Sequence, residues 1–231
     1  QLSYLLDPGR HPLVVRTARC GCSDEQKRAC KDVCPFDALI LNGEGDIDVD
    51  TLGCVGCGVC VDNCKAKKLV ENRDVLAAIT AIRTSEKPVY AMIAPAFANQ
   101  YSEAVTPGKL RAAFKRIGFS GMVEVALFAD ILTLKEALEF DRNIQSEQDY
   151  QLTSCCCPMW IGMIRKVFAQ LMPHVPASVS PMAACGRAIK QLHPGAITVF
   201  IGPCVAKKAE AREPDIREST DFVLTFQEIQ D

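Results

Sequence analysis

The stretch CVGCGVCVDNC, residues 54–64, decides the fold of the first part of this chain. Its cysteines are separated by gaps of two, two and three residues. Gaps this short let successive thiolates converge on one metal–sulfur cube, and this spacing is the bacterial 4Fe–4S pattern. The glycines between them let the backbone wrap closely and point N–H groups at the sulfurs. We therefore expect this segment to fold around a 4Fe–4S cluster, whose binding supplies folding energy.

A second, less regular cysteine run precedes it. Cys20-x-Cys22-x7-Cys30-x3-Cys34 is followed by Pro35, and the stretch between its second and third cysteines, SDEQKRA, is enlarged, charged and expected to be exposed. Cys64, in contrast, is followed by Lys65 instead of the usual Pro. In two-cluster proteins the fourth cysteine of each run ligates the other cluster. We thus assign one cluster to Cys34, Cys54, Cys57 and Cys60, and the other to Cys20, Cys22, Cys30 and Cys64.

These runs predict a ferredoxin-like, α+β domain over residues 1–70 that binds two 4Fe–4S clusters. A zinc module is the alternative, because Cys-x2-Cys pairs also bind Zn²⁺. Zinc modules seldom use this spacing, and the text CPFDAL after the first run is typical of ferredoxins. An electron-transfer role is therefore the firmest expectation.

The composition limits the other possibilities. The chain has 231 residues, a net charge of −2, and 13 cysteines against three histidines. A chain without a basic excess is a poor candidate for nucleic-acid binding, and no apolar run approaches a membrane span. Cysteines that are odd in number and crowded at cluster spacing argue against a secreted disulfide scaffold. We expect a cytoplasmic, anaerobic setting.

After residue 70 the sequence alternates between strand and helix patterns. Buried strands are expected at 88–95, 122–127, 196–201 and 221–224, and helices at 107–117, 130–140, 158–171 and 181–192. This alternation predicts an α/β domain over residues 71–231, with a mostly parallel sheet flanked by helices. Thr225-x-x-Glu228 is a capping box that starts a helix. Because the chain stops at Asp231, we expect this domain to be incomplete.

A second cysteine group identifies the class of this domain. Residues 152–160 read LTSCCCPMW, and residues 201–210 read IGPCVAKKAE. These stretches resemble the first two motifs of the iron-only (FeFe) hydrogenases, TSCCPGW and MPCxxKxxE. Supporting text is spread over nearly the whole domain: IAP at 93–95, GKLRAAFKRIGF at 108–119, FADILTLKEA at 128–137 and SPM at 180–182.

The resemblance implies an H-cluster, a 4Fe–4S cube joined through a cysteine sulfur to a two-iron centre with CO and cyanide ligands. It implies that Cys157 and Cys204 are cube ligands and that Cys156 is the proton-transfer thiol. The remaining roles, also carried over by motif, are Lys207 holding a cyanide ligand, Glu210 as its acidic partner, Ser180 lining the site, and Glu136 and Glu139 in the proton path.

Each role has a plainer alternative. Cys155 is an extra cysteine relative to the motif, so the ligand could be Cys156 with Cys155 as the proton donor. Vicinal cysteines can also be small buried hydrophobes. Glu136 and Glu139, spaced i,i+3 on one helix face, could form a solvated surface. Cys185 matches no motif and is expected in the core.

Three departures from the family text favour a divergent, slow or sensory member. Gly202 replaces Met, Met159 replaces Gly and Met182 replaces Gln, and in the family these positions contact the two-iron centre. The third motif, which gives the last two cube ligands, would lie beyond Asp231. The full H-cluster is thus expected only in the complete protein.

The leading hypothesis is a hydrogenase-like oxidoreductase that reversibly reduces protons to H₂, with electrons entering through two clusters. Its redox partner would be a ferredoxin or a reductase subunit. The alternatives are a sensory relative that binds H₂ with low turnover, and a non-catalytic two-cluster electron-transfer protein.

Overall fold

A four-stranded parallel sheet organises the second part of the molecule. The computed structural model describes residues 3–153 and 156–230. The sheet has the order β6-β5-β7-β8, and every neighbouring pair is parallel. Its strands are β5 (Val89–Ile93), β6 (Gly121–Glu124), β7 (Ile197–Gly202) and β8 (Phe222–Thr225). The predicted α/β class with a parallel sheet is confirmed.

Two helices of this part begin and end where their caps predict. In α5 (Pro107–Ile117), Thr106 accepts a hydrogen bond from the Lys109 backbone N–H at 3.3 Å, and Gly118 follows the last turn. In α8 (Pro181–Leu192), Ser180 accepts from the Ala183 N–H at 3.3 Å. A side-chain oxygen at the N-cap and Pro in the first turn fix both starts. The inner face of α8 contributes Met182, Cys185 and Ile189 to the core.

Two other helices differ from their predicted ranges. The helix α6 spans Ala126–Asn143, so the predicted end of the strand at residue 127 and the predicted start of the helix at residue 130 are wrong. Val125 N–H donates to Ile93 O as the last contact of the sheet, and Val125 itself is already helical. The helix α7 spans Pro158–Val167 and ends at Phe168, where the backbone leaves the helical region. A short 3-10 segment, η3 (Ala169–His174), replaces its predicted last turn.

The cysteine-rich region contains two small antiparallel sheets. One pairs β1 (Val14–Arg16) with β4 (Leu69–Glu71), and the other pairs β2 (Leu39–Leu41) with β3 (Ile47–Val49). The helices of this region are α2 (Asp24–Asp32) and α3 (Val59–Asp62). The enlarged stretch between Cys22 and Cys30 is therefore mostly helical. The small apolar core includes the thiols of Cys60 and Cys64; the two-domain division at residue 70 and the ferredoxin-like assignment remain predictions.

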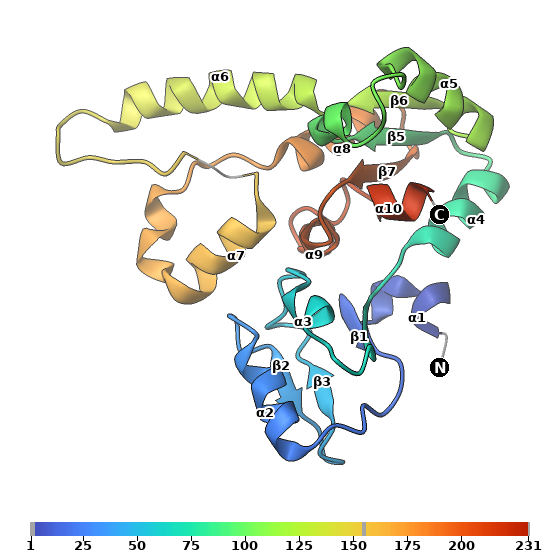
Figure 1. Ribbon diagram of the computed structural model, residues 1–231. Helices are drawn as coiled ribbons and strands as arrows, with labels where there is room; N and C mark the ends of the chain where they lie inside the picture. The colour runs from blue at the N-terminus through green and yellow to red at the C-terminus, as the bar shows by residue number, and fades with distance from the viewer. Residues whose placement is uncertain (1–2, 154–155, 231) are drawn as a thin grey trace.

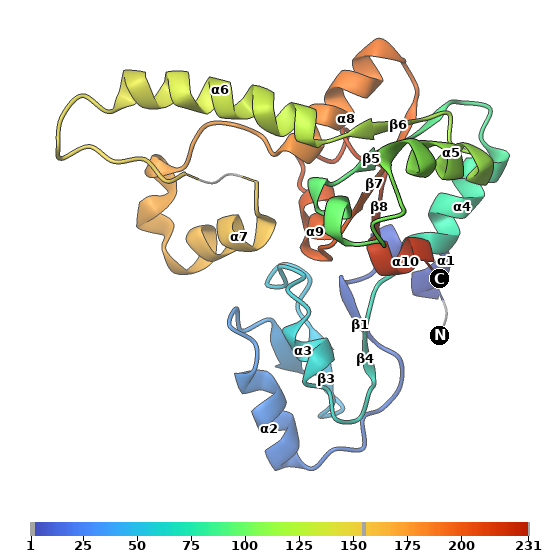
Figure 2. The same ribbon diagram turned by 45° about the horizontal axis from the view of Figure 1, so that its top comes forward.

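The two regions meet at α9 (Ala206–Ala211). Figures 1 and 2 both place α9 between the parallel sheet and α3. Gly56, at φ +72°, allows this approach, because a Cβ there would lie 3.1 Å from the Ala206 Cα. The helix α1 (Ser3–Leu6) packs against α4 (Val75–Thr84), and α10 (Phe226–Gln230) packs against β8. Among the described residues, no helix is long and apolar enough to span a membrane.

Candidate functional site

Four cysteines that the sequence assigns to one cluster share one cavity. Cys20, Cys22, Cys30 and Cys64 line a cavity of about 220 Å³ in the cysteine-rich region. A capping box between Ser23 and Gln26 fixes the start of α2 and so places Cys30. The N–H groups of Lys68 and Leu69 point at the Cys64 sulfur, at 3.3 and 3.5 Å.

The four cysteines assigned to the other cluster line a second, much smaller cavity. Cys34, Cys54, Cys57 and Cys60 surround it with apolar side chains. The Ala38 N–H donates to the Cys34 sulfur at 3.3 Å. Four thiols around one space, with backbone N–H groups directed at sulfur, form a donor set that fits a 4Fe–4S cluster.

Burial raises the pKa of several thiols in these cavities. Burial, aided by Cys54, Cys57 and Cys34, raises the pKa of Cys60 to about 12. Burial also raises the pKa of Cys30 and that of Cys54. Since metal ligands must be thiolates, cluster binding would release protons here. Among the described residues, no group of three or more Cys, His, Asp or Glu has the geometry for a single metal ion.

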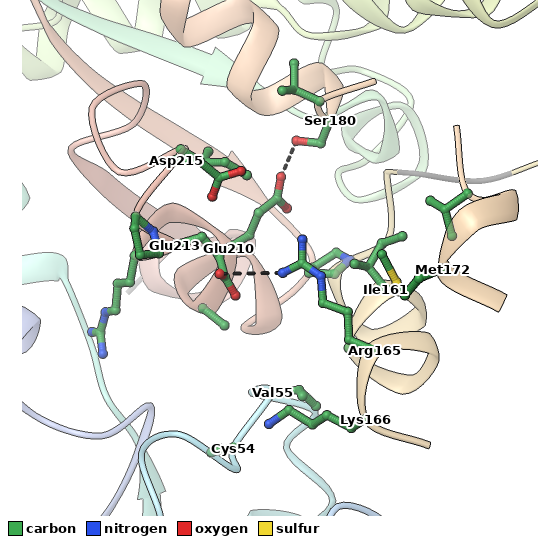
Figure 3. A pocket seen from close by; sticks show the side chains of 18 of the residues that line it. Cys54, Val55, Ile161, Arg165, Lys166, Met172, Ser180, Glu210, Glu213 and Asp215 are labelled. Carbon is green, nitrogen blue, oxygen red and sulfur yellow. Dashed lines mark hydrogen bonds and ion pairs between the residues drawn. The ribbon is translucent and has the colours of Figure 1, made fainter. Parts of the chain in front are cut away.

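A chain of hydrogen bonds joins the two hydrogenase-like motifs. The Lys207 ammonium donates to the Cys156 carbonyl at 2.8 Å and to Glu210 Oε2 at 2.6 Å. The Ser180 hydroxyl donates to the other oxygen of Glu210 (Figure 3). Glu210 and Ser180 are buried, with exposed fractions of 8% and 4%. The structure thus brings together four of the predicted residues, Lys207, Glu210, Ser180 and Cys156, from three separate segments.

The two expected cube ligands flank this chain of hydrogen bonds. Cys157 is exposed at the start of α7, and Cys204 is half-buried just before α9. The Cys204 carbonyl accepts from the Lys207 N–H at 3.3 Å. The alternative assignment makes Cys156 the cube ligand and Cys155 the proton donor. Cys155 lies outside the described residues.

The predicted proton-path acids lie on one face of α6 and are half-buried. Glu139 Oε1 accepts from the Ala177 N–H at 3.0 Å. Lys135, which the sequence analysis did not single out, donates to the Ala177 carbonyl at 3.2 Å. Glu139 therefore reaches the loop that leads to Ser180, and Glu136 lies one turn before it on the same helix.

A large cavity lies between α7, α9 and the loop that carries Cys54. Its volume is about 640 Å³, and Glu210 and Ser180 line it together with Cys54 and Val55. Figure 3 shows Ser180 and Glu210 at one side of this space and Cys54 and Lys166 at the other. Sequence reasoning missed this cavity because its walls come from distant segments. It links the neighbourhood of the second cluster set to the Lys207–Glu210 pair.

Two contacts hold the Cys54 loop against α7. The Lys166 ammonium donates to the carbonyls of Leu52 and Gly53 at 2.7 and 2.6 Å. A Cβ at Gly162 would lie 2.8 Å from Val55 Cγ1, so the helix approaches the loop closely. The helix α7, which directly follows Cys157, thus contacts the predicted cluster loop.

The three residues that differ from the family motifs, Gly202, Met182 and Met159, lie in three different environments. Gly202 ends β7, and a Cβ there would lie 2.6 Å from the Phe200 ring and 3.1 Å from Ala94 Cβ. Met182 is buried in the core of the parallel-sheet region. Met159 is half-buried in the first turn of α7. Cys185 is fully buried, as expected, and burial raises its pKa to about 12.

Comparison with known proteins supports the hydrogenase resemblance. Residues 87–231 match the family model described as "Iron only hydrogenase large subunit, C-terminal domain". The NADP-reducing hydrogenase subunit HndD of Solidesulfovibrio fructosivorans is 26% identical over 201 residues, which are 76% of this chain and 34% of that protein. The cytosolic iron-sulfur assembly component 3 of Bos taurus is 28% identical over 208 residues, covering 76% of this chain and 44% of that protein.

The fold has a counterpart among solved structures. An FeFe-hydrogenase studied for its inactivation by oxygen aligns with a TM-score of 0.57 at 24% identity, over 68% of this chain and 46% of that one. The chain spans less than half the length of the curated relatives named above.

Proposed function

This chain belongs to the iron-only hydrogenase large-subunit family, and from that premise we propose that it serves the reversible reduction of protons to H₂, with electrons delivered through two 4Fe–4S clusters. The observation that carries the proposal is the Lys207–Glu210–Ser180 chain of hydrogen bonds, which also binds the Cys156 carbonyl. It unites both family motifs in one buried polar site.

The proposed electron route begins in the cysteine-rich region. Cys20, Cys22, Cys30 and Cys64 would hold the outer cluster, and Cys34, Cys54, Cys57 and Cys60 the inner one. The contacts of the Cys54 loop with α7 and α9 support this order, because they bring the inner set toward the motif residues. A ferredoxin or a reductase subunit in the cytoplasm is the proposed donor.

Cys157 and Cys204 are proposed to be two of the ligands that hold the cube of the H-cluster. When bound, the H-cluster would supply the two-electron chemistry at iron. Lys207 would present a positive charge to an anionic ligand of that group. Glu210 and the Cys156 carbonyl hold the ammonium group in place, at 2.6 and 2.8 Å.

Proton delivery is proposed to use Glu139, Glu136 and Cys156. The half-burial of both glutamates and the Glu139–Ala177 hydrogen bond favour this role over a solvated surface. Acids on one helix face can relay protons when they are a turn apart.

The proposal is tested with the full-length protein after anaerobic maturation, by measuring H₂ evolution from reduced methyl viologen. Glu210→Gln should lower the rate by about 10–100-fold, because it removes the charge that orients Lys207. The exposed Glu86→Gln variant is the control and should retain full activity. Equal rates for Glu210→Gln and the control would contradict the assigned role.

Specific observations favour two other functions. A sensory relative is favoured by Gly202, Met159 and Met182, and would show H₂ binding with very low turnover. A non-catalytic iron–sulfur protein is favoured by the match to an assembly component, which covers as much of this chain as the match to the hydrogenase subunit. Iron–sulfur signals without any H₂ turnover in the matured full-length protein would support the latter.

A further inference from the structure

The two cysteine cavities differ sharply in charge. The cavity of Cys20, Cys22, Cys30 and Cys64, the outer cavity, is also lined by four cationic residues, Arg16, Lys27, Lys65 and Lys68. The inner cavity, lined by Cys34, Cys54, Cys57 and Cys60, has no Lys, Arg, Asp or Glu among its lining residues. Two sites with the same donor set thus have different electrostatic surroundings, one cationic and one uncharged.

Two of the outer cations are fixed in place by a buried carboxylate. Asp46 is 5% exposed, and its oxygens lie 3.3 Å from Arg16 Nη1 and 3.8 Å from Lys27 Nζ. The side chains of Arg16 and Lys27 are only 19% and 15% exposed. Because they are partly buried, their charges are less screened than those of surface lysines. Asp46 offsets one of the four positive charges and leaves an excess.

Two of these cations come from the places where the cysteine runs depart from the usual pattern. The enlarged spacing between Cys22 and Cys30 forms the start of α2, whose capping box sets the turn that carries Lys27. Lys65 stands directly after Cys64, where Pro is usual, and lines the same cavity. Both departures therefore deliver a positive charge to one site.

The positive charge that reaches the inner cavity comes from outside its lining. Lys166 does not line the cavity, but its charge favours the thiolate form of Cys54 and so opposes the increase in pKa that burial causes there. Its ammonium group already donates to the carbonyls of Leu52 and Gly53. The apolar lining of the inner cavity, Val14, Leu39 and Val49 among others, favours less charge in that site.

Charge near a cluster changes its reduction potential. A cube held by four thiolates is an anion, and accepting one electron makes it more negative, so nearby cations stabilise the reduced form more than the oxidised form. Resting on the two clusters of the proposed function, we propose that Lys27 and Lys65 raise the reduction potential of the outer cluster above that of the inner one. The outer cluster is then the first of the two to be reduced as the potential is lowered.

The test is a redox titration of the reconstituted full-length protein with dithionite, followed by electron paramagnetic resonance. Lys27→Met and Lys65→Gln remove one cation each. Lys31→Met is the matched control, since Lys31 lies in the last turn of the same helix, is exposed and does not line the cavity. Cys22→Ser and Cys57→Ser assign each reduction step to one cavity.

Each cation variant should shift the higher-potential step to lower potential and leave the other step in place, and Lys31→Met should shift neither step comparably. The inference is overturned if both steps shift together, if neither shifts, or if Cys22→Ser alters the lower-potential step. If Lys27→Met loses iron, the exposed Lys65→Gln decides alone. A wild-type protein that lacks the iron of two clusters would refute the proposed function instead.

Discussion

Two neighbouring lysines of α9 pair with glutamates in two different parts of the molecule. Lys207 points to Glu210 at the candidate site, while the side chain of Lys208 is 1% exposed and pairs with Glu228 at 2.7 Å. Lys208 also donates to the Asn72 carbonyl at 2.8 Å, at the end of β4. One short helix therefore serves the candidate site with one residue and the junction of the two regions with the next.

The Lys208–Glu228 pair gives a prediction about stability. Glu228→Gln keeps an acceptor for the Thr225 N–H in the capping box but leaves the buried Lys208 charge without its counterion. Removing one partner of a buried ion pair costs about 3–5 kcal/mol. We expect a loss of that size in the free energy of unfolding, measured by urea denaturation.

The matched control for this prediction is an exposed ion pair. Arg19 and Glu44 have side chains 74% and 63% exposed, and Glu44→Gln should change the stability far less, because solvent screens an exposed ion pair. The double change Lys208→Met with Glu228→Gln should recover part of the loss, since neither member of the pair then carries a charge. Equal losses for Glu228→Gln and Glu44→Gln would refute the importance of the buried pair.

At the residue scale, the sequence motif predicts roles for Lys207 and Glu210 but none for Lys208. The first two are three residues apart on one helix, so the sequence alone shows that they can meet. Glu228 lies 20 residues and Asn72 lies 136 residues from Lys208. Only the folded chain brings these groups together, and no local sequence pattern predicts their contact.

At the scale of elements, the contact between the Cys54 loop and α9 is the critical one. Gly56 adopts φ +72°, and a Cβ there would lie 3.1 Å from the Ala206 Cα and 3.2 Å from Leu13 Cδ1. A backbone atom cannot move aside as a flexible side chain can. A Cβ at residue 56 would therefore require the loop and α9 to move apart by a few tenths of an ångström.

Gly56→Ala should destabilise the protein more than Gly45→Ala. Gly45 has nearly the same backbone conformation, φ +73°, but open space around its Cα, so both variants bear the strain of a left-handed residue. Only Gly56→Ala adds a clash, for which we expect about 1–3 kcal/mol more. Urea midpoints of the two variants measure the difference, and identical midpoints would mean that the loop does not press on α9.

Elements with a local start signal are predictable from the sequence. Thr106, Ser180 and the Thr225–Glu228 capping box each mark a helix that the structure contains. The start of α6 has no such signal: Val125 continues an apolar strand pattern yet turns into the helix after its hydrogen bond with Ile93. The break after α7 at Phe168 is likewise unmarked in the sequence.

At the scale of the whole molecule, three cavities follow one another from the outer cysteine set to the Ser180–Glu210 site. Cys54 lines both the inner cysteine cavity and the large cavity that Glu210 lines. The spacing of the cysteines predicts which of them share a cavity. It does not predict that the inner set borders the motif residues, because that depends on how α7 and α9 pack on the 52–56 loop.

The most direct measurement is the infrared spectrum of the matured full-length protein, with and without Cys204→Ala. The account predicts stretching bands of CO and cyanide in the wild type, and their loss when the ligand at position 204 is removed. Intact 4Fe–4S signals without any such bands in the wild type would contradict the proposed active site.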